Sequence, residues 1–503
     1  MNESNSVAVV QQTLRREVER LGPGAKLSSV RRLMSEHRVS PVTVRRAMAG
    51  LTAEGVLDAR PGQGTFVAPA RPAEAAEADF GWQGLALGSA RVSADAIMSL
   101  LTLPVPGAIN LAGGYPAEDL QALDLVSRAM VRAARRPGVW GRMPLEGIEG
   151  LRTWFAQQAG PAVSPHEVLI CPGSQSAINT AFNALAAPGA AILMESPSYV
   201  GAIVAARAAG LRLIPVPTDR DGVRPEILAQ AFASSGARLF YSQPTHANPT
   251  GATLAPDRRQ GVLEVVERAG AILIEDDWCR DLSFEKAPPP PLVSADRNGH
   301  CVYLRSITKA TAPGLRIGAI VARGAALSRL AASRMVSDFF VSGPMQEAAL
   351  DLVHSPGWLR HLRDMRTRLM ARRDVLAAAV KQHFGESSVT LLPAGGMHLW
   401  VRLDDSVDDV AFAARAAEAR VLVSAGRPWF PAEATGSYLR LSYACAPEGS
   451  LRRAVETLAR PSTIRRLDLS SPPRKRGPSA NSVSRPRRSV SRDVPAKSAR
   501  GTR

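Results

Sequence analysis

The 503-residue chain is long enough for two to three domains, and with 45% hydrophobic and 21% charged residues most of it can form packed cores. No apolar run approaches the roughly 18 to 20 residues of a membrane-spanning helix, and the start does not resemble a signal peptide. The four cysteines are scattered, which argues against a disulfide framework or a metal site and favours a cytoplasmic protein. The net charge of +17 is concentrated at the two ends, since residues 1–70 carry ten basic and six acidic residues and residues 460–503 carry 13 and two.

Composition divides the chain into four segments. Residues 7–68 predict short helices followed by a small hairpin, and residues 69–95, rich in Ala, Pro and Gly, predict a linker. Apolar strand-like runs alternate with helical stretches over residues 96–459. Residues 460–503, rich in Arg, Ser and Pro, predict a disordered basic tail, which either adds salt-sensitive affinity for nucleic acid or has no role.

The first segment predicts a winged helix-turn-helix. Ser40 is a typical N-cap, followed by Pro41 at the first helical position, and the next apolar residues share one helix face: Val44, Ala47, Met48 and Leu51. A preceding helix from about Ser28 is joined to this one by a short turn, so the second helix is expected to enter the DNA major groove. Two short strand-like runs around residues 60–64 predict the wing.

Residues 27–68, LSSVRRLMSEHRVSPVTVRRAMAGLTAEGVLDARPGQGTFVA, resemble the GntR family of bacterial transcription regulators. The resemblance implies binding to a double-stranded DNA operator, with Ser29 and Arg31 on the phosphate backbone and Gly62 and Gly64 shaping the wing tip. The residues expected at the groove are Pro41, Thr43, Arg45 and Arg46, of which the last three are expected to project from a face other than the apolar one.

The central segment predicts an α/β fold. Its strand candidates are short and apolar on both faces, and several are separated by helix-length stretches: residues 190–196, 211–217, 238–244, 271–277, 301–307 and 318–322. Strands of this kind lie between helical layers in a mostly parallel sheet. A strand-helix-strand stretch over residues 389–445 predicts a smaller α+β subdomain.

Polar motifs follow several of these strands, at the edge where open α/β sheets bind ligands. The loop 173–177, GSQSA, opens a helix whose free N–H groups would suit a phosphate. The other motifs are Tyr199 after ESPS, PTHANPTG over residues 244–251, EDD over residues 275–277, and SITK over residues 306–309 followed by APGLR.

This set resembles the fold-type I, pyridoxal-phosphate-dependent aminotransferases over residues 96–459. The resemblance implies pyridoxal 5′-phosphate as cofactor, with Lys309 and Asp276 as catalytic residues: Lys309 forms the Schiff base and Asp276 pairs with the pyridine nitrogen. It places Asn248 at the ring 3-oxygen, Tyr199 against the ring, and Arg440 at a substrate carboxylate. The phosphate is expected among Ser174, Gln175, Ser306, Thr308 and Arg316.

Two positions depart from the family pattern. Many members carry a tyrosine three residues after the aspartate, where this chain has Cys279, preceded by Trp278. A thiol is a poorer hydrogen-bond partner than a phenol, so the substitution weakens the case for efficient turnover. Relatives also carry a tyrosine that reaches the partner subunit's cofactor, and here Trp140 or Arg142 could stand at that place.

The fusion of the two parts resembles the MocR subfamily of GntR regulators, which implies a homodimer and a small amino-compound or amino-acid effector. On this hypothesis, effector binding shifts the populations of two protein states and thereby the affinity for DNA. Two alternatives remain open: the chain is an aminotransferase acting on amino acids, or the large domain is a dimerisation body that has lost its cofactor.

Overall fold

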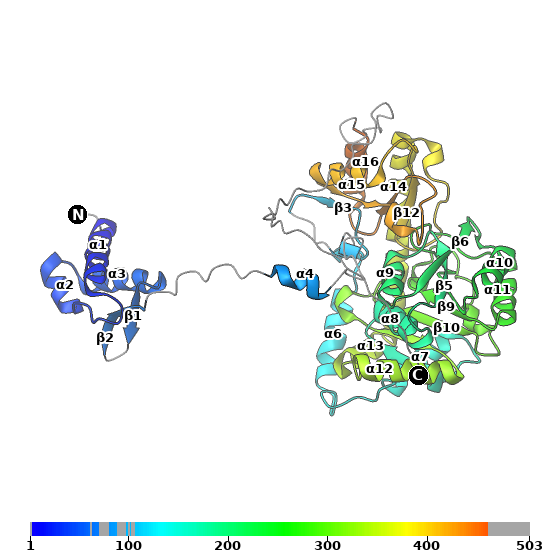
Figure 1. The fold of residues 1–503 in the computed structure, drawn as a ribbon, viewed down its shortest axis with the longest axis horizontal. Coiled ribbons are helices and arrows are strands. Elements are labelled where there is room, and N and C mark those ends of the chain that lie inside the picture. Colours follow the sequence, from blue (N-terminus) through cyan, green and yellow to red (C-terminus); the bar gives the residue numbers. More distant parts are fainter. Residues whose placement is uncertain are drawn as a thin grey trace, which may run out of the picture. The chain divides into compact units, whose positions relative to one another are not determined.

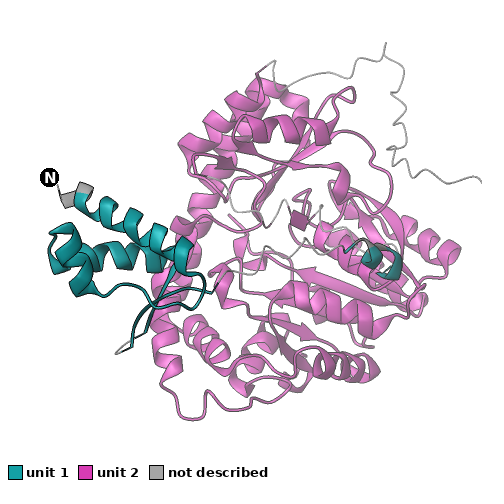
Figure 2. Cartoon of the chain, turned by 60° about the vertical axis from the view of Figure 1, so that its left-hand side comes forward, with its two compact units in different colours: residues 1–90 teal, residues 91–503 magenta. Residues whose placement is uncertain are grey.

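The computed structural model describes residues 3–60, 63–69, 80–87, 97–98, 101 and 106–460. The chain divides into two compact units, residues 1–90 and 91–503 (Figures 1 and 2). Gly62, most of the expected linker, and the expected tail after Arg460 lie outside the described residues. Within the described ranges, no helix combines the length and the apolar character that crossing a membrane requires.

The first unit is a winged helix-turn-helix. Helices α1 (Glu3–Leu21), α2 (Val30–His37) and α3 (Pro41–Ala53) precede an antiparallel hairpin of β1 (Leu57–Arg60) and β2 (Gly64–Val67), and a short helix α4 (Gly81–Leu87) follows. Helix α2 ends where Arg38 adopts a left-handed conformation, φ +52°. Helix α3 begins where the Ser40 hydroxyl accepts a hydrogen bond from the Thr43 N–H, at 3.2 Å. The apolar face expected for this helix is buried in the core of the unit.

The second unit is built on an eight-stranded sheet in the order β4-β11-β10-β9-β8-β5-β6-β7. Its strands are β4 (Val168–Cys171), β5 (Ala191–Ser196), β6 (Arg212–Asp219), β7 (Gly222–Val223), β8 (Leu239–Ser242), β9 (Ile272–Asp277), β10 (Cys301–Ser306) and β11 (Gly318–Val321). The pairs from β10 through β6 are parallel, which confirms the mostly parallel sheet. Strand β11 is antiparallel to β10, because the chain between Ser306 and Gly318 is too short for a helical crossover.

Helices cover both faces of this sheet (Figure 1). They are α6 (Leu123–Ala134), α7 (Glu149–Ala159), α8 (Ser174–Leu185), α9 (Val200–Ala208), α10 (Pro225–Ser235), α11 (Pro256–Arg268), α12 (Gly324–Ser337) and α13 (Gly343–Val353). Alternate residues of one strand enter different cores: Leu193 belongs to one hydrophobic cluster, and its neighbours Ile192 and Met194 belong to the other. Burial on both faces explains why these strands are apolar throughout.

A smaller α+β subdomain completes the second unit and confirms the expectation for residues 389–445. Strands β12 (His398–Arg402), β15 (Tyr438–Ser442) and β14 (Ser424–Ala425) form an antiparallel sheet in that order. Helices α14 (Pro356–Phe384), α15 (Asp409–Glu418) and α16 (Glu448–Leu458) accompany it. Strand β3 (Ile109–Asn110) pairs with β13 (Val421–Leu422), so the chain that enters the second unit is tied to this subdomain.

Candidate functional site

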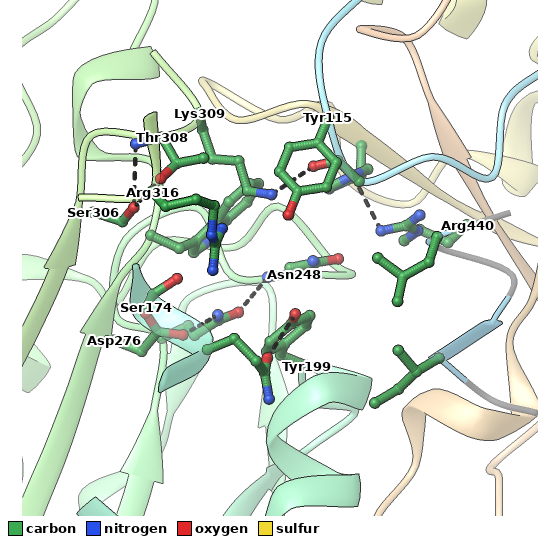
Figure 3. A pocket seen from close by; sticks show the side chains of 17 residues that line it. Tyr115, Ser174, Tyr199, Asn248, Asp276, Ser306, Thr308, Lys309, Arg316 and Arg440 are labelled. Carbon is green, nitrogen blue, oxygen red and sulfur yellow. Dashed lines mark hydrogen bonds between the residues drawn. The ribbon is translucent and has the colours of Figure 1, made fainter. Parts of the chain in front are cut away.

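A cavity of about 250 Å³ lies at the carboxyl ends of the parallel strands (Figure 3). The structure brings to its walls every residue expected to hold the cofactor or the substrate: Ser174, Gln175, Tyr199, Asn248, Asp276, Ser306, Thr308, Lys309, Arg316 and Arg440. In Figure 3, Ser306, Thr308 and Arg316 lie on one side of Lys309 and Arg440 lies on the other. The cavity therefore has an end suited to a phosphate and an opposite end suited to a carboxylate.

Lys309 follows β10 and its amine lies inside the cavity. Nζ donates a hydrogen bond to the Gly114 carbonyl at 2.7 Å and lies 3.6 Å from the centre of the Tyr115 ring. Burial lowers the pKa of this amine to about 7, and the positive charges of Arg316 and Arg440 act in the same direction. A lysine with a pKa near neutrality has a substantial fraction of the uncharged, nucleophilic form.

Asp276 lies near the end of β9 and is fully buried. Its Oδ2 accepts hydrogen bonds from the Tyr241 hydroxyl at 2.6 Å and from Gln243 Nε2 at 2.7 Å, while its Oδ1 has no partner among the described residues. Burial raises the pKa of this carboxyl to about 6, although the two hydrogen bonds oppose the shift. An unpartnered carboxylate oxygen in a buried site is costly and calls for a donor from a bound group.

Asn248 and Tyr199 also line the cavity. The Asn248 N–H donates to Gln243 Oε1 at 2.8 Å, and its own side-chain Oδ1 has no partner within the described chain. Tyr199 precedes α9, and its hydroxyl donates to Gln175 Oε1 at 3.0 Å. Because Gln175 Nε2 donates to the Gly201 carbonyl at 3.0 Å, the Gln175 amide serves to orient the tyrosine ring.

The phosphate end combines a helix N-terminus with hydroxyl groups and an arginine. Helix α8 begins at Ser174 after Gly173, whose φ of +88° favours glycine and where a Cβ would lie 2.7 Å from Arg316 Nη2. The Ser306 hydroxyl donates to Thr308 Oγ1 at 3.0 Å, and Arg316 Nη2 donates to the Pro172 carbonyl at 3.0 Å. Free N–H groups, the helix dipole and a guanidinium together favour an anion.

Arg440, in β15, is completely buried. Its Nη2 donates to the carbonyls of Ala112 and Gly113, its Nη1 donates to His398 Nε2 at 3.1 Å, and its Nε has no partner in the part of the chain that the structure describes. Within the described ranges no carboxylate forms an ion pair with it. Burial lowers the pKa of this guanidinium to about 10, so it stays charged at neutral pH and calls for an anion from a ligand.

The cavity also includes residues that the sequence did not single out. They are Ile97, Leu101, Gly114, Tyr115, Gln243 and His398. Tyr115 and His398 come from a loop and from the small subdomain, far along the chain from the strand-end motifs, so no local pattern announces them. Trp278 lines the cavity, whereas Cys279 does not and lies with its Sγ 4.0 Å from the His246 carbonyl.

In the first unit, most of the residues expected to contact DNA are exposed: Ser29, Arg31, Pro41, Arg45, Arg46 and Gly64. Thr43 differs from the expectation, since it is only 5% exposed and its Oγ1 lies 2.9 Å from the Ser40 hydroxyl. The contact with the N-cap Ser40, three residues earlier, holds this side chain at the start of the helix, whereas Arg45 and Arg46 are exposed. Gly64 has φ +117°, a conformation that favours glycine at the wing.

Comparisons with known proteins give a match for each of the two units. Residues 108–458 match the family described as aminotransferase class I and II, and residues 7–67 match the gntR family of bacterial regulatory proteins. YisV, an HTH-type transcriptional regulator of Bacillus subtilis, is 30% identical over 89% of this chain and 93% of its own length. MocR of Rhizobium meliloti, a probable rhizopine catabolism regulatory protein, is 28% identical over 76% of this chain and 78% of its own. LysN, the α-aminoadipate aminotransferase of Thermus thermophilus, crystallised with N-(5′-phosphopyridoxyl)-L-leucine, is 30% identical with a TM-score of 0.68, covering 73% of this chain and 94% of LysN.

The chain therefore belongs to the class I and II aminotransferase family and carries, fused to that fold, the helix-turn-helix domain of GntR regulators. Its architecture is that of the HTH-type regulators that include MocR. Pyridoxal 5′-phosphate is the cofactor of this family, and the cavity fits it. The unpartnered Asp276 Oδ1 suits a protonated pyridine nitrogen, the α8 N-terminus with Arg316 suits the phosphate, and Lys309 supplies the amine.

Proposed function

We propose that the protein is a DNA-binding regulator whose aminotransferase-like domain holds pyridoxal 5′-phosphate and senses an amino acid. The observation that carries the proposal is the pairing, in one cavity, of the Lys309 amine with the buried guanidinium of Arg440, which has no carboxylate partner within the described residues. A cavity with these two groups suits a ligand that has both an amino group and a carboxylate. The same chain carries a winged helix-turn-helix, which supports DNA binding as the response.

When bound, the cofactor supplies an aldehyde carbon that reacts with primary amines. The chain's own groups prepare the site for it. Lys309 Nζ holds or releases a proton near neutral pH, and the unpartnered Asp276 Oδ1 would accept a hydrogen bond from the ring nitrogen. In the same cavity, Asn248 and Tyr199 would contact the cofactor ring, and Ser174, Ser306, Thr308 and Arg316 would hold the phosphate.

At the other end of the cavity, Arg440 binds and orients the effector's carboxylate. The physical basis of the response is linkage: an effector that binds two protein states unequally shifts their populations, and therefore the affinity for DNA. Because β3 ties the entering chain to the small subdomain that carries Arg440, a movement of this subdomain offers a route toward the DNA-binding unit.

The active form in this proposal is a homodimer. Large apolar side chains are exposed on the second unit, which supports a contact with a second copy: Trp140, Met335, Val336 and Phe339. Neither Trp140 nor Arg142 lines the cavity of its own chain, which leaves both available for a partner's site.

The second candidate function is transamination of amino acids, which the presence of both Lys309 and Asp276 favours. Single-turnover reactions with a panel of amino acids separate the two functions. Rapid conversion of the cofactor to its amine form, followed by recovery with a keto acid, would establish an enzyme. If conversion of the cofactor is slow or absent and the amino acid still changes DNA binding, the result supports a sensor.

The cofactor part of the proposal is tested by incubating the protein with pyridoxal 5′-phosphate, reducing with borohydride and analysing the peptides by mass. We expect one adduct at Lys309, its loss in Lys309→Ala, and its retention in the control Lys286→Ala, at an exposed lysine outside the cavity. If the wild-type protein forms no adduct at Lys309, only one alternative remains: the large domain is a dimerisation body without cofactor.

A further inference from the structure

His398, the first residue of β12, contacts the carboxylate end of the cavity and is only 4% exposed. Its Nε2 lies 3.1 Å from Arg440 Nη1. A guanidinium can only donate, so Nε2 must accept, and the proton of the neutral imidazole is on Nδ1. This contact fixes both the tautomer and the charge state of the histidine.

The surroundings of the ring keep it neutral. Burial lowers the pKa of His398 well below its ordinary value, and the positive charges of Arg440 and Lys309 lower it further. The Gly113 carbonyl acts in the opposite direction but does not offset these causes. A neutral acceptor therefore faces Arg440 at neutral pH.

Trp278 holds the imidazole in this orientation. The two rings are stacked, with centroids 5.5 Å apart and planes at 22°. The indole is itself fixed, because its Nε1 donates to the His246 carbonyl at 3.0 Å. Trp278 follows Asp276 by two residues, so one segment supplies both the carboxylate that would meet the cofactor ring and the wall next to Arg440.

The remaining contacts of Arg440 leave its positive charge uncompensated. Two backbone carbonyls accept from Nη2, and the guanidinium lies 4.5 Å from the centre of the Trp429 ring. A carboxylate at position 398 would also hold Nη1, but it would neutralise Arg440 and compete with a ligand. A neutral imidazole orients the guanidinium and leaves its charge for the ligand.

We propose that His398, held by Trp278, is a positioning residue for Arg440 and thereby determines that the site selects amines bearing a carboxylate. This inference rests on the proposed function, in which Arg440 binds the effector's carboxylate. His398 makes Arg440 selective because a neutral imidazole orients the guanidinium without neutralising it.

The test measures how strongly the holoprotein prefers an amino acid over the same molecule without its carboxylate. Cofactor absorbance is titrated with three pairs: L-alanine and ethylamine, L-leucine and isoamylamine, L-phenylalanine and phenethylamine. The recorded ratio is the dissociation constant of the amine divided by that of the amino acid, for the pair with the largest response. The amine lacking a carboxylate reports any general damage to the site, because it does not use Arg440.

Two near-isosteric variants separate the roles of the ring nitrogens. His398→Gln places an amide oxygen near the position of Nε2 and is expected to keep the wild-type ratio within about threefold. His398→Asn places its amide near Nδ1, loses the contact with Arg440, and is expected to reduce the ratio at least about tenfold, as is His398→Phe. His398→Glu, which neutralises Arg440, is expected to abolish the preference.

The control is His300→Phe, at a half-buried histidine at the amino end of β10, outside the cavity. It is expected to leave the ratio unchanged. Equal ratios for His398→Asn, His398→Gln and the wild type would overturn the inference, even if His398→Phe failed to fold. A wild-type protein with no preference for the amino acid would instead overturn the carboxylate role of Arg440, and with it the proposed function.

Discussion

The lowered pKa of Lys309 gives a prediction that does not depend on the cofactor. Its pKa is about 7, against an ordinary value of 10.5, because the amine is buried beside Arg316 and Arg440. At pH 8 the uncharged fraction of such an amine is about 90%, whereas that of an ordinary lysine is about 0.3%. Since only the uncharged amine is nucleophilic, Lys309 is expected to react about 300 times faster at pH 8 than an equally accessible ordinary lysine.

The assay is pulse labelling of the cofactor-free protein with acetic anhydride between pH 5.5 and 10, with quantification of the Lys309 peptide by mass spectrometry. The rate should rise about tenfold between pH 6 and 8 and then level off. In Arg440→Met, which removes one of the cationic causes, the midpoint should move to higher pH. A lysine peptide added to the same reaction provides the reference for an unperturbed amine.

A Lys309 labelling rate that keeps rising to pH 10, as in the reference peptide, would refute the argument from burial and neighbouring charge. If the midpoint lies near 7 and Arg440→Met does not move it, burial still accounts for the lowered pKa of Lys309. The contribution of Arg440 to that pKa would then be contradicted.

Three further outcomes are expected. Replacing Arg31, the arginine expected on the phosphate backbone, with alanine should weaken DNA binding and reduce the slope of log affinity against log salt concentration by up to about one, measured by fluorescence anisotropy at several salt concentrations; an unchanged slope would exclude a phosphate contact at Arg31. Asp276→Asn should weaken cofactor retention at least about tenfold in equilibrium dialysis, since the pyridine nitrogen loses an anionic acceptor; wild-type retention would contradict this pairing. Leu51→Ala should destabilise the first unit by about 2–5 kcal/mol, so that DNA binding is lost at a lower temperature while the cofactor spectrum melts as in the wild type; loss of both together would contradict independent units.

The sequence predicted the large sheet and the strand-end residues because both follow from local patterns. Strands such as β9 are short and apolar on both faces, and the carboxyl ends of parallel strands meet at one edge. Asp276 and Ser306 end neighbouring parallel strands, so their approach could be expected from chain order alone. The direction of β11 depends instead on the length of the connection after Ser306, which the apolar pattern does not encode.

The residues that were missed reach the cavity through long-range packing. His398 is brought to Arg440 by the pairing of β12 with β15, and Tyr115 by the fold of the chain around β3. Thr43 was expected to project toward the groove and is buried instead. Helical spacing alone could not reveal that the N-cap Ser40 contacts the Thr43 hydroxyl. Contacts of this kind depend on which surfaces pack together, and a single sequence does not specify them locally.

The departure at Cys279 has a structural consequence. Its thiol does not line the cavity, and burial raises its pKa well above the ordinary value, so it does not replace a phenol at the cofactor ring. The neighbouring Trp278 lines the wall instead and stacks on His398. This segment thus supports the wall of the cavity next to Arg440.

The most direct test of the sensing account is the affinity of the cofactor-loaded protein for a DNA duplex that the protein itself selects from random sequences. We predict that a neutral L-amino acid that changes the cofactor spectrum also changes this affinity or the footprint, and that Lys309→Ala shows neither change. A clear spectral response with unaltered affinity and footprint in the wild type would contradict the coupling of cavity and DNA.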